Sequence, residues 1–545
     1  MKKWNVLSSI KQLTEEKLLT ILLENRKITT KVQKERFLTP KLSDVTIESV
    51  KIDKQELKKS VERINKAIKE KKQIIVFGDY DVDGICGSAI LWETLNDLGA
   101  NVLPYIPSRF EEGYGLSIKS IDNLLKEQKE IDLIITVDNG IVANDAVDYA
   151  TSKGIDVIIT DHHVSSDIKP KAFSIVHTTL LCGTGVAYLL SKSFKKKDYD
   201  NHLELVVLAT IADLVPLTNA NRVLAHFGLE ALRKTKRVGL LALFSSAGID
   251  REEVDIYEIG HVIAPRLNAM GRLESAMDSL RLICTTSSKR ASTLAKALSD
   301  TNLERQKFTV KALMHAKDKA KGKLVNNLLF IVDESYQQGV IGLVAGRLVE
   351  EFYLPSIVIS KGKTYSKASV RSVKGFNIIE FLRQASDLLV DVGGHPMAAG
   401  FTVETKKLDQ LEEKLYKLSA KLLKKDHLER ILNIDLEIPS SFISFKTYEL
   451  ISKLKPFGMA NPEPTFVTKG LKVEGLKVIG KDGKHLKLNL KPNDSSFWID
   501  AIAFGMGELN QIKIGDEIKV AYTLDLNEWN GNKKLQLKIK DIKKN

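Results

Sequence analysis

Eight acidic or imidazole side chains stand at places in the sequence where they could share one site. Carboxylates that gather closely repel one another, and only protonation or a bound cation relieves that repulsion. Mainly oxygen ligands with one or two imidazole nitrogens suit Mn²⁺ or Mg²⁺ better than zinc. Two such ions can activate water and stabilise both oxygens of a phosphoryl displacement, so the set predicts a metal-dependent phosphoesterase. Its members are Asp79, Asp81, Asp83, Asp138, Asp161, His162, His163 and Asp213.

Short β-branched runs precede most of these residues. Residues 74–79, 131–138 and 155–161 each end on an acid, and helical patterns lie between them. Near-continuous apolar strands that alternate with helices indicate a parallel sheet covered on both faces. In such a sheet, functional groups collect beyond the carboxyl ends of the strands, and all three runs carry their acids at that end.

Each motif also has an ordinary structural explanation. Residues 79–84 could form a calcium loop or a helix cap, but no acid stands at the closing position of a twelve-residue EF-hand loop. Residues 137–140 alone are typical of a turn. His162 and His163, next to an acid at the third strand end, favour the metal interpretation. Asp213 ends an apolar helix, where its negative charge interacts unfavourably with the helix dipole. A bound metal would offset that cost.

The composition predicts a globular protein. Hydrophobic residues make up 43% and charged residues 28% of a 545-residue chain, a length that suggests about two to four domains. No run of about 18 apolar residues is present, so we expect no membrane span. Residues 1–5 lack signal-peptide features, and the three cysteines match no disulfide or metal spacing, so we expect a cytoplasmic location. The net charge of +13 fits a nucleic-acid partner, but a lysine-rich solvated surface would give the same balance.

Changes of pattern divide the chain into five expected segments. A long charged helix over 303–321 ends before Gly322 and could join two domains. Alternating runs separated by turn residues near the C-terminus indicate a small barrel or sandwich. The segments are a mostly helical N-terminal segment (1–70), a first α/β domain (71–225), a helical region with the connecting helix (226–325), a second α/β domain (326–428) and the β-rich domain (429–545).

The acidic motifs resemble, in chain order, the four motifs of the DHH phosphoesterase superfamily, which here are 79–83, 137–140, 161–163 and Asp213. The triplet Gly393-Gly394-His395 is similar to the glycine-glycine-histidine signature of the DHH-associated domain. The small pyrophosphatase branch of the superfamily carries a histidine where this sequence has Phe77, and that departure argues against this branch.

Three further segments narrow the resemblance to the RecJ family of bacterial single-strand-specific 5′→3′ DNA exonucleases: 181–186, 264–273 and 454–466. The resemblance covers roughly residues 50–545. It implies a parallel-sheet DHH domain, a second α/β DHH-associated domain joined by a long helix, and a C-terminal OB-fold β-barrel. It also implies two bound ions, Mn²⁺ or Mg²⁺, and single-stranded DNA as the partner.

The resemblance also assigns roles to the eight residues. Asp79 and Asp161 would either bind metal or support the ligands, and His163 would orient the site or contact the scissile phosphate. His395 would reach the transferring phosphoryl group from the second domain. The most direct metal ligands would be Asp81, Asp83, Asp138, His162 and Asp213.

Several residues resemble the family's pocket for the 5′ phosphate. Gly393 and Gly394 would permit close backbone approach, although without the family context they would be an ordinary strand turn. Arg266 and Arg272 would bind phosphate or form ion pairs between domains, and Arg109 would guide the strand. The pocket itself would consist of Ser369, Arg371 and Ser372.

The β-rich domain would supply a binding groove, because OB-folds combine positive charge with aromatic platforms. Each aromatic candidate could instead belong to the core. The candidates are Phe497, Trp498, Tyr522 and Trp529, interleaved with Lys513, Lys519, Lys533 and Lys534.

The sequence as a whole predicts a single-strand-specific exonuclease acting in DNA repair and recombination. A helicase and a single-strand-binding protein are candidate partners, and nothing demands more than a monomer. One alternative is an oligoribonucleotide or cyclic-dinucleotide phosphodiesterase of the same superfamily, but such proteins usually lack a C-terminal barrel. The other is a catalytically inactive DNA-binding scaffold, which the intact acids in all four motifs disfavour.

Overall fold

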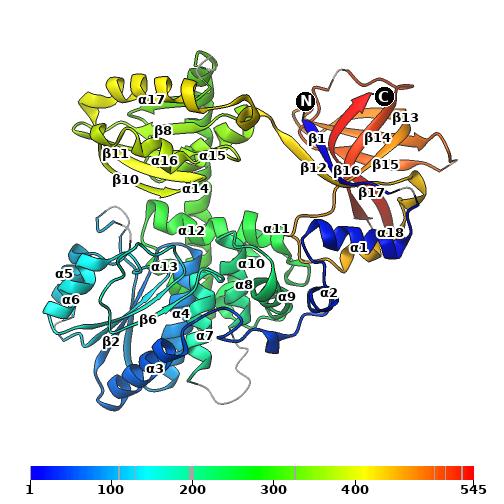
Figure 1. Ribbon diagram of the computed structural model, residues 1–545. Helices are drawn as coiled ribbons and strands as arrows, with labels where there is room; N and C mark the ends of the chain where they lie inside the picture. The colour runs from blue at the N-terminus through cyan, green and yellow to red at the C-terminus, as the bar shows by residue number, and fades with distance from the viewer. Residues whose placement is uncertain are drawn as a thin grey trace.

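Three β-sheets organise the protein in the computed structural model (Figure 1). Within the part of the chain that the structure describes, no helix has both the length and the apolar character that crossing a membrane needs. The described residues are 2–10, 12–108, 111–113, 115–128, 130–194, 202–323, 327–495, 497–509, 511–529 and 532–544.

The first sheet is parallel throughout and has the strand order β3-β2-β4-β5-β6. Every residue of β4 is buried, as expected for a central strand covered on both faces. The strands are β2 (Gln73–Gly78), β3 (Asn101–Tyr105), β4 (Leu133–Val137), β5 (Asp156–Asp161) and β6 (Ser174–His177).

Alternate side chains of this sheet enter two separate apolar cores. Ile74 and Val76 pack on the face covered by α3, α4 and α7, whereas Ile75 and Phe77 pack on the face covered by α5 and α6. This alternation follows from the two-residue period of a strand and confirms the predicted parallel α/β domain. The helices are α3 (Lys54–Lys69), α4 (Val82–Asp97), α5 (Ile118–Glu127), α6 (Asn144–Ser152) and α7 (Gly183–Lys192).

A helical region follows and packs beside α4 and α7 (Figure 1). Helix α8 is buried over nearly its whole length and ends immediately before Asp213. The helices are α8 (Leu203–Ala212), α9 (Asn219–Arg233), α10 (Val238–Ala247), α11 (Ile256–Glu258), α12 (Ala264–Leu273) and α13 (Met277–Cys284).

Helix α14 (Ser288–Lys321) joins the first domain to the second. Ala291 and Ala295 in its first half pack in the core of the first domain, and Ala316 and Ala320 in its second half pack against the second sheet. The predicted connecting helix is therefore confirmed, but it begins at Ser288, earlier than the expected start near residue 303.

The second sheet has the order β10-β11-β9-β8-β7, and only its β7–β8 pair is parallel. Helix α15 covers one face together with α14, while α16 and α17 cover the other. The elements are β7 (Leu329–Asp333), α15 (Ile341–Phe352), β8 (Ser356–Ser360), β9 (Tyr365–Arg371), α16 (Ile378–Arg383), β10 (Leu389–His395), β11 (Ala398–Glu404) and α17 (Leu408–Leu422).

The C-terminal sheet has the order β1-β12-β13-β14-β15-β17-β16, and β13 also pairs with β16. That additional pairing closes β13, β14, β15, β17 and β16 into a ring, which is the predicted barrel. Helix α18 (Phe445–Ser452) precedes β13. The strands are β1 (Lys3–Ser8), β12 (Ile431–Glu437), β13 (Phe466–Ile479), β14 (His485–Pro492), β15 (Ile499–Ala503), β16 (Glu517–Trp529) and β17 (Asn532–Lys544).

The start of the chain belongs to this C-terminal domain. Strand β1 pairs with β12 in parallel, so the prediction of a helical segment is wrong for residues 3–8. This edge strand leaves most of its side chains exposed, and its sequence therefore has no clear apolar alternation. Helices α1 (Glu15–Asn25) and α2 (Lys31–Leu38) pack into the barrel's core, and α2 also contacts α9 through Phe37 and Arg222. Val45, Val50, Ile52 and helix α3 pack in the core of the first sheet's domain.

Candidate metal centre and phosphate pocket

The predicted metal ligands come together at the carboxyl ends of β2, β4 and β5. Ligand atoms lie within 4.8 Å of one another in three overlapping groups. The groups are Asp79, Asp81 and Asp138; Asp83, His162 and Asp213; and Asp138, His162 and His163.

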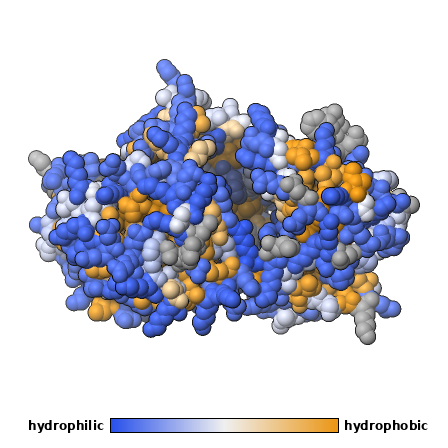
Figure 2. Space-filling model, turned by 90° about the horizontal axis from the view of Figure 1, so that it is seen from above, coloured by the Kyte–Doolittle hydropathy of each residue, from blue (hydrophilic) through white to orange (hydrophobic). Residues whose placement is uncertain are grey.

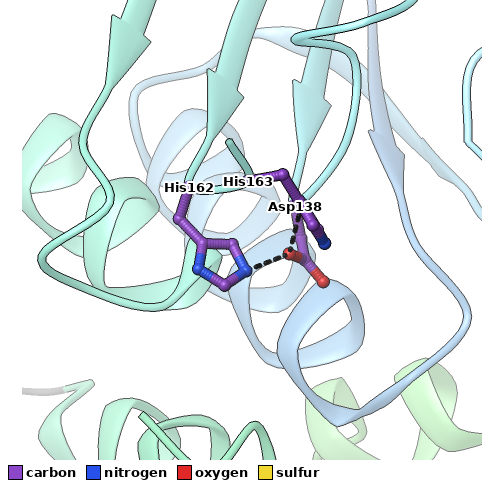
Figure 3. A group of neighbouring side chains, drawn as sticks. All are labelled: Asp138, His162 and His163. Carbon is purple, nitrogen blue, oxygen red and sulfur yellow. Dashed lines mark ion pairs between the residues drawn. The ribbon is translucent and has the colours of Figure 1, made fainter. Parts of the chain in front are cut away.

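His162 lies at the centre of this crevice. Its Nε2 atom is 3.1 Å from Asp138 Oδ1, 3.7 Å from Asp83 Oδ2 and 3.6 Å from Asp213 Oδ2. Figure 3 shows the imidazole of His162 directed at the Asp138 carboxylate from the neighbouring strand end. Three chain segments far apart in sequence therefore converge on one nitrogen.

The backbone is shaped to allow this convergence. Asp138 has a φ of 63°, a left-handed conformation that Asp tolerates better than most residues. A Cβ added to Gly183 would lie 2.6 Å from the Asp138 Cβ, so residue 183 must be glycine. The first amides of α7 bind Asp83: Gly183 N donates to Oδ2 at 2.7 Å and Thr184 N donates to Oδ1 at 2.6 Å. Gly183 and Thr184 were not predicted as site residues, although the segment 181–186 was part of the family resemblance.

Asp161 is occupied by hydrogen bonds rather than directed at the crevice. Its Oδ1 accepts from the backbone N–H of His162 at 2.6 Å and lies 2.8 Å from His163 Nδ1, and its Oδ2 accepts from Ile141 N at 2.9 Å. His177 Nε2 lies 2.7 Å from the carbonyl oxygen of His163. Asp161 and His177 thus hold the turn that aims both histidines, and this geometry favours the supporting role for Asp161.

The Asp161 contact also sets the charge of His163. Burial alone would lower the pKa of His163, but the hydrogen bond and charge of Asp161 outweigh it and raise that pKa to about 9. For His162, burial is the dominant influence and lowers the pKa. One imidazole is therefore cationic and the other neutral near neutral pH, and a neutral imidazole is the form that binds metal.

Three carboxyl groups of the crevice hold their protons unusually tightly. Burial, followed by the charge of Asp83, raises the pKa of Asp81 and of Asp138, and the same two causes raise the pKa of Asp213 to about 8. Crowded carboxylates of this kind bind a cation in place of their protons. Hard oxygen donors with one neutral imidazole fit Mn²⁺ or Mg²⁺, so the donor set matches the predicted ions.

His395 lies beside this site and comes from the second domain. Its ring centroid is 6.4 Å from that of His163, and the two ring planes differ by 15°. His395 ends β10, and the tight reversal into β11 depends on Gly394, which has a φ of 140°. A Cβ there would lie 2.4 Å from the carbonyl oxygen of Ala398, so only glycine fits.

Part of the predicted phosphate pocket lies beside His395. His395 pairs with Ala398 and Ala398 pairs with Arg371 across β10, β11 and β9, while Gly393, Gly400 and Ser369 form the next such row. Residues in one row point to the same face of a sheet, as do residues two apart along a strand. Arg371, Ser369 and His395 therefore share a face on which small residues leave room for a ligand.

The N-terminus of α15 adjoins this face. A Cβ at Gly342 would lie 2.9 Å from Ser369 Oγ and 3.3 Å from Arg371 Nη2, which places the first turn of α15 directly against both side chains. Free amides at a helix N-terminus attract anions. Gly342 was not predicted, and its helical position in the sequence gives no signal of this contact.

Two other phosphate candidates use their side chains for hydrogen bonds within the protein. The Ser372 hydroxyl is buried and donates to the carbonyl of Phe376 at 2.7 Å, so it stabilises its own turn. Arg266 donates to Val262 O at 2.7 Å and to Ser299 on α14 at 3.3 Å. The prediction for Arg109 falls outside the described residues.

Helix α12 connects the metal crevice to the predicted phosphate pocket. Asn268 Oδ1 accepts from Val82 N at 3.0 Å, and a Cβ at Gly271 would lie 2.7 Å from the carbonyl of Tyr80, so α12 packs on the loop that carries the first acids. At its end, Arg272 donates to Gly339 O at 3.2 Å, just before α15. Asn268 and Gly271 were not predicted, although both lie in the segment 264–273.

The aromatic candidates of the C-terminal domain separate into two kinds. Phe497 is 41% exposed and Trp498 is 58% exposed, as binding platforms must be. Tyr522 is fully buried and shares a 2.8 Å hydrogen bond with Thr468, so it is a core residue. The side chain of Trp529 lies outside the described part of the structure.

Family models match the three domains defined by the sheets. The DHH family N-terminal domain matches residues 73–215, the DHHA1 domain matches 320–422, and the RecJ OB domain matches 434–541. Fold and site therefore define a member of the DHH phosphoesterase superfamily.

Curated relatives identify the particular family. The chain is 36% identical over 498 residues to the single-stranded-DNA-specific exonuclease RecJ of Bacillus subtilis, covering 89% of this chain and 63% of that relative, so it spans less than two thirds of the relative's length. It is 30% identical to the protein of that name from Haemophilus influenzae and 31% identical to that from Escherichia coli, covering 89% of this chain and 90% of each relative. The chain belongs to the RecJ family.

Solved structures agree with this assignment. The crystal structure of RecJ in complex with Mn²⁺ from Thermus thermophilus superposes with a TM-score of 0.84 at 27% identity, covering 100% of this chain and 80% of that chain. The complex of RecJ with Mg²⁺ from the same organism gives a TM-score of 0.78 at 26% identity, covering 100% of this chain and 78% of that chain.

Proposed function

We propose that this protein is a metal-dependent exonuclease that degrades single-stranded DNA from its 5′ end. The observation that carries the proposal is the approach of His395 to His163, with 6.4 Å between ring centroids. This approach places the face of the second sheet that carries Ser369 and Arg371, which suits a phosphate, opposite the acidic crevice, which suits divalent metal. Membership of a family of single-stranded-DNA-specific exonucleases supports the substrate and the reaction.

The two carboxylate-rich groups of the crevice would hold two Mn²⁺ or Mg²⁺ ions. Asp79, Asp81 and Asp138 form one ligand group, and Asp83, His162 and Asp213 form the other. When bound, such ions activate water and stabilise the charge that develops during phosphoryl displacement.

His163 would contact the scissile phosphate. Because Asp161 engages its Nδ1 and raises its pKa to about 9, His163 keeps a proton on Nε2 near neutral pH, available to donate to a phosphate oxygen. His395 would approach the same phosphate from the second domain. Asp161 and His177 position His163 and do not themselves touch the substrate.

The 5′→3′ direction of digestion would follow from the phosphate pocket. Ser369, Arg371 and the first amides of α15 offer donors that suit a terminal phosphate, and Gly393 leaves room beside them. A 5′-phosphorylated end held here would present its first phosphodiester bond to the metal crevice. The exposed aromatics of the barrel would bind the following nucleotides, and stacking of this kind requires unpaired bases.

The cellular setting is part of the proposal. A DNA exonuclease of this family would act in the cytoplasm in DNA repair and recombination, as a monomer, with a helicase and a single-strand-binding protein supplying its substrate. The RecJ-type OB domain gives no support to the oligoribonucleotide or cyclic-dinucleotide alternative.

Digestion of end-labelled oligonucleotides tests the proposal. Single- and double-stranded DNA, labelled at either end, would be incubated with Mn²⁺, Mg²⁺ or chelator. We expect metal-dependent release of the 5′ label from single strands. Release from 3′ ends, or equal attack on duplex, would overturn the polarity or the strand preference.

A further inference from the structure

A loop of the C-terminal domain docks on the chain segment that follows Asp213 of the metal crevice. Residues 453–462 link α18 to β13 and contact the connection between α8 and α9. Leu217 N, in that connection, donates to Met459 O at 2.8 Å, and a Cβ at Gly458 would lie 2.7 Å from Leu217 Cδ1. Leu217 is itself buried, so the loop and the connection form one packed interface.

An arginine of α9 holds the loop from the other side of the interface. Arg222, on α9, is only 3% exposed. Its guanidinium donates to the backbone carbonyls of Leu454 at 2.9 Å and Lys455 at 2.7 Å in the loop, and to that of Phe37 at 3.0 Å. It also stacks on the Phe37 ring, 3.7 Å from its centroid. Burial lowers the pKa of Arg222 to about 10, which still leaves it charged near neutral pH.

The partners of Arg222 are backbone carbonyl oxygens rather than carboxylates, so its hydrogen bonds constrain the backbone conformation of the loop. A guanidinium presents donors in a rigid planar fork, so several carbonyls must be arranged around it at once. Asn461 braces the same loop from within, because its Nδ2 donates to Leu454 O at 2.9 Å and Pro456 O at 2.8 Å. Asn461 therefore stabilises the conformation of the loop, and Arg222 attaches the loop to α9.

The connection that this loop holds carries Asp213 at its start. Asp213 caps α8, and Leu214 directly after it adopts a φ of 57° as the chain leaves the helix. Asn221 Nδ2 donates to Pro216 O at 3.1 Å, which ties the middle of the connection to α9. The Asp213 carboxylate is 30% exposed, and its Oδ2 lies 3.6 Å from His162 Nε2, so its place depends on the backbone behind it.

We propose that Arg222 and the loop 453–462 are positioning elements of the nuclease site, holding Asp213 in place for metal. The inference rests on the proposed metal role of Asp213. It gives the contact between the two domains a chemical purpose: the C-terminal domain would complete the metal centre in addition to binding DNA. It also explains why the segment 454–466 accompanies a catalytic domain that is distant in the sequence.

Mn²⁺ binding to the 545-residue protein without DNA tests the inference, using calorimetry on Arg222→Gln, Gly458→Ala and Asp213→Asn. Loss of an outer partner of a ligand weakens metal affinity roughly 10–100-fold, so we expect Arg222→Gln to weaken Mn²⁺ binding about tenfold and to reproduce part of the Asp213→Asn loss. Gly458→Ala removes no charge but displaces Leu217, and we expect it to weaken Mn²⁺ binding as well. Adding Leu217→Ala to Gly458→Ala should restore affinity.

Arg63→Gln is the matched control. Arg63 is also a nearly buried arginine, but it pairs with Asp132 at 2.6 Å and Asp156 at 2.7 Å, at the amino ends of β4 and β5 and away from the metal crevice. It should lower thermal stability without changing Mn²⁺ affinity. Parent-like Mn²⁺ affinity in whichever of Arg222→Gln and Gly458→Ala is folded would overturn the inference. A parent that binds Mn²⁺ but does not digest single strands would instead refute the proposed function and leave this inference standing.

Discussion

At the scale of single residues, the site is built from carboxylates whose ionised form is destabilised by burial and by neighbouring acids. Burial and the neighbouring acids raise the pKa of Asp138 well above its ordinary value, and its backbone adopts a φ of 63°. Both features cost stability in a protein without metal. We therefore expect Asp138 to serve metal binding and not the stability of the fold.

Asp138→Asn separates these two roles. Asn tolerates positive φ as well as Asp does, so the substitution removes charge without disturbing the backbone. We expect nuclease activity in Mn²⁺ to fall at least about 100-fold through lost metal affinity, while the melting temperature in chelator rises because repulsion is relieved. Activity assays and thermal unfolding measure the two effects. A lowered melting temperature with retained activity would make Asp138 a structural residue.

Metal binding should be coupled to proton release. In the metal-free protein the pKa of Asp213 is about 8, so this carboxyl is mostly protonated at neutral pH and must lose its proton to bind metal. Mn²⁺ affinity should therefore increase as pH rises toward about 8 and then level off. Calorimetry in buffers of different ionisation enthalpy would measure the released protons, and Asp213→Asn should reduce their number by about one at pH 7. A pH-independent affinity would contradict this coupling.

The residues that sequence reasoning found and missed differ in a physical way. Asp79, His162 and Asp213 were found because acids and histidines after apolar runs have few other uses. Gly183 and Thr184 were missed because their contribution is backbone amides and the absence of a side chain. Such roles depend on which chain segment lies opposite, and that information exists only in the folded structure.

At the scale of elements, β9 and α15 carry the residues of the proposed phosphate pocket. Arg371→Ala should weaken digestion of 5′-phosphorylated single strands at least about tenfold and affect 5′-hydroxyl strands much less, because it removes a charged donor to the terminal phosphate. Competition between the two substrates measures the preference. Lys367→Ala is the control, since Lys367 lies on the same strand and face but farther from α15. An unchanged preference in Arg371→Ala would place the 5′ phosphate elsewhere.

The elements were predicted well where periodicity is strong and poorly at edges. The buried strands β2, β4 and β5 have near-continuous apolar sequences, so their existence and their parallel arrangement followed from pattern alone. Strand β1 was missed because most of its side chains are exposed and its partner β12 lies more than four hundred residues away. Long-range pairing of an edge strand leaves no local signal.

At the scale of the whole molecule, the second and C-terminal domains stand side by side above the DHH domain (Figure 1). Seen from above, the surface is hollowed between them and mostly hydrophilic, with apolar residues gathering over the C-terminal domain's side (Figure 2). The net charge of +13 favours a polyanion at such a surface.

Trp498 tests whether the barrel contributes stacking as well as charge. Trp498→Ala should weaken binding of single-stranded DNA by about 1–3 kcal/mol, the usual effect of removing one aromatic platform, and should leave the salt dependence of binding unchanged because no charge is lost. Fluorescence anisotropy in chelator at several salt concentrations measures both quantities. Tyr365→Ala is the control, because Tyr365 is 55% exposed but lies at the far end of β9. If the two substitutions weaken binding equally, or if Trp498→Ala flattens the salt dependence, the barrel binds DNA through its lysines and Trp498 does not stack on a base.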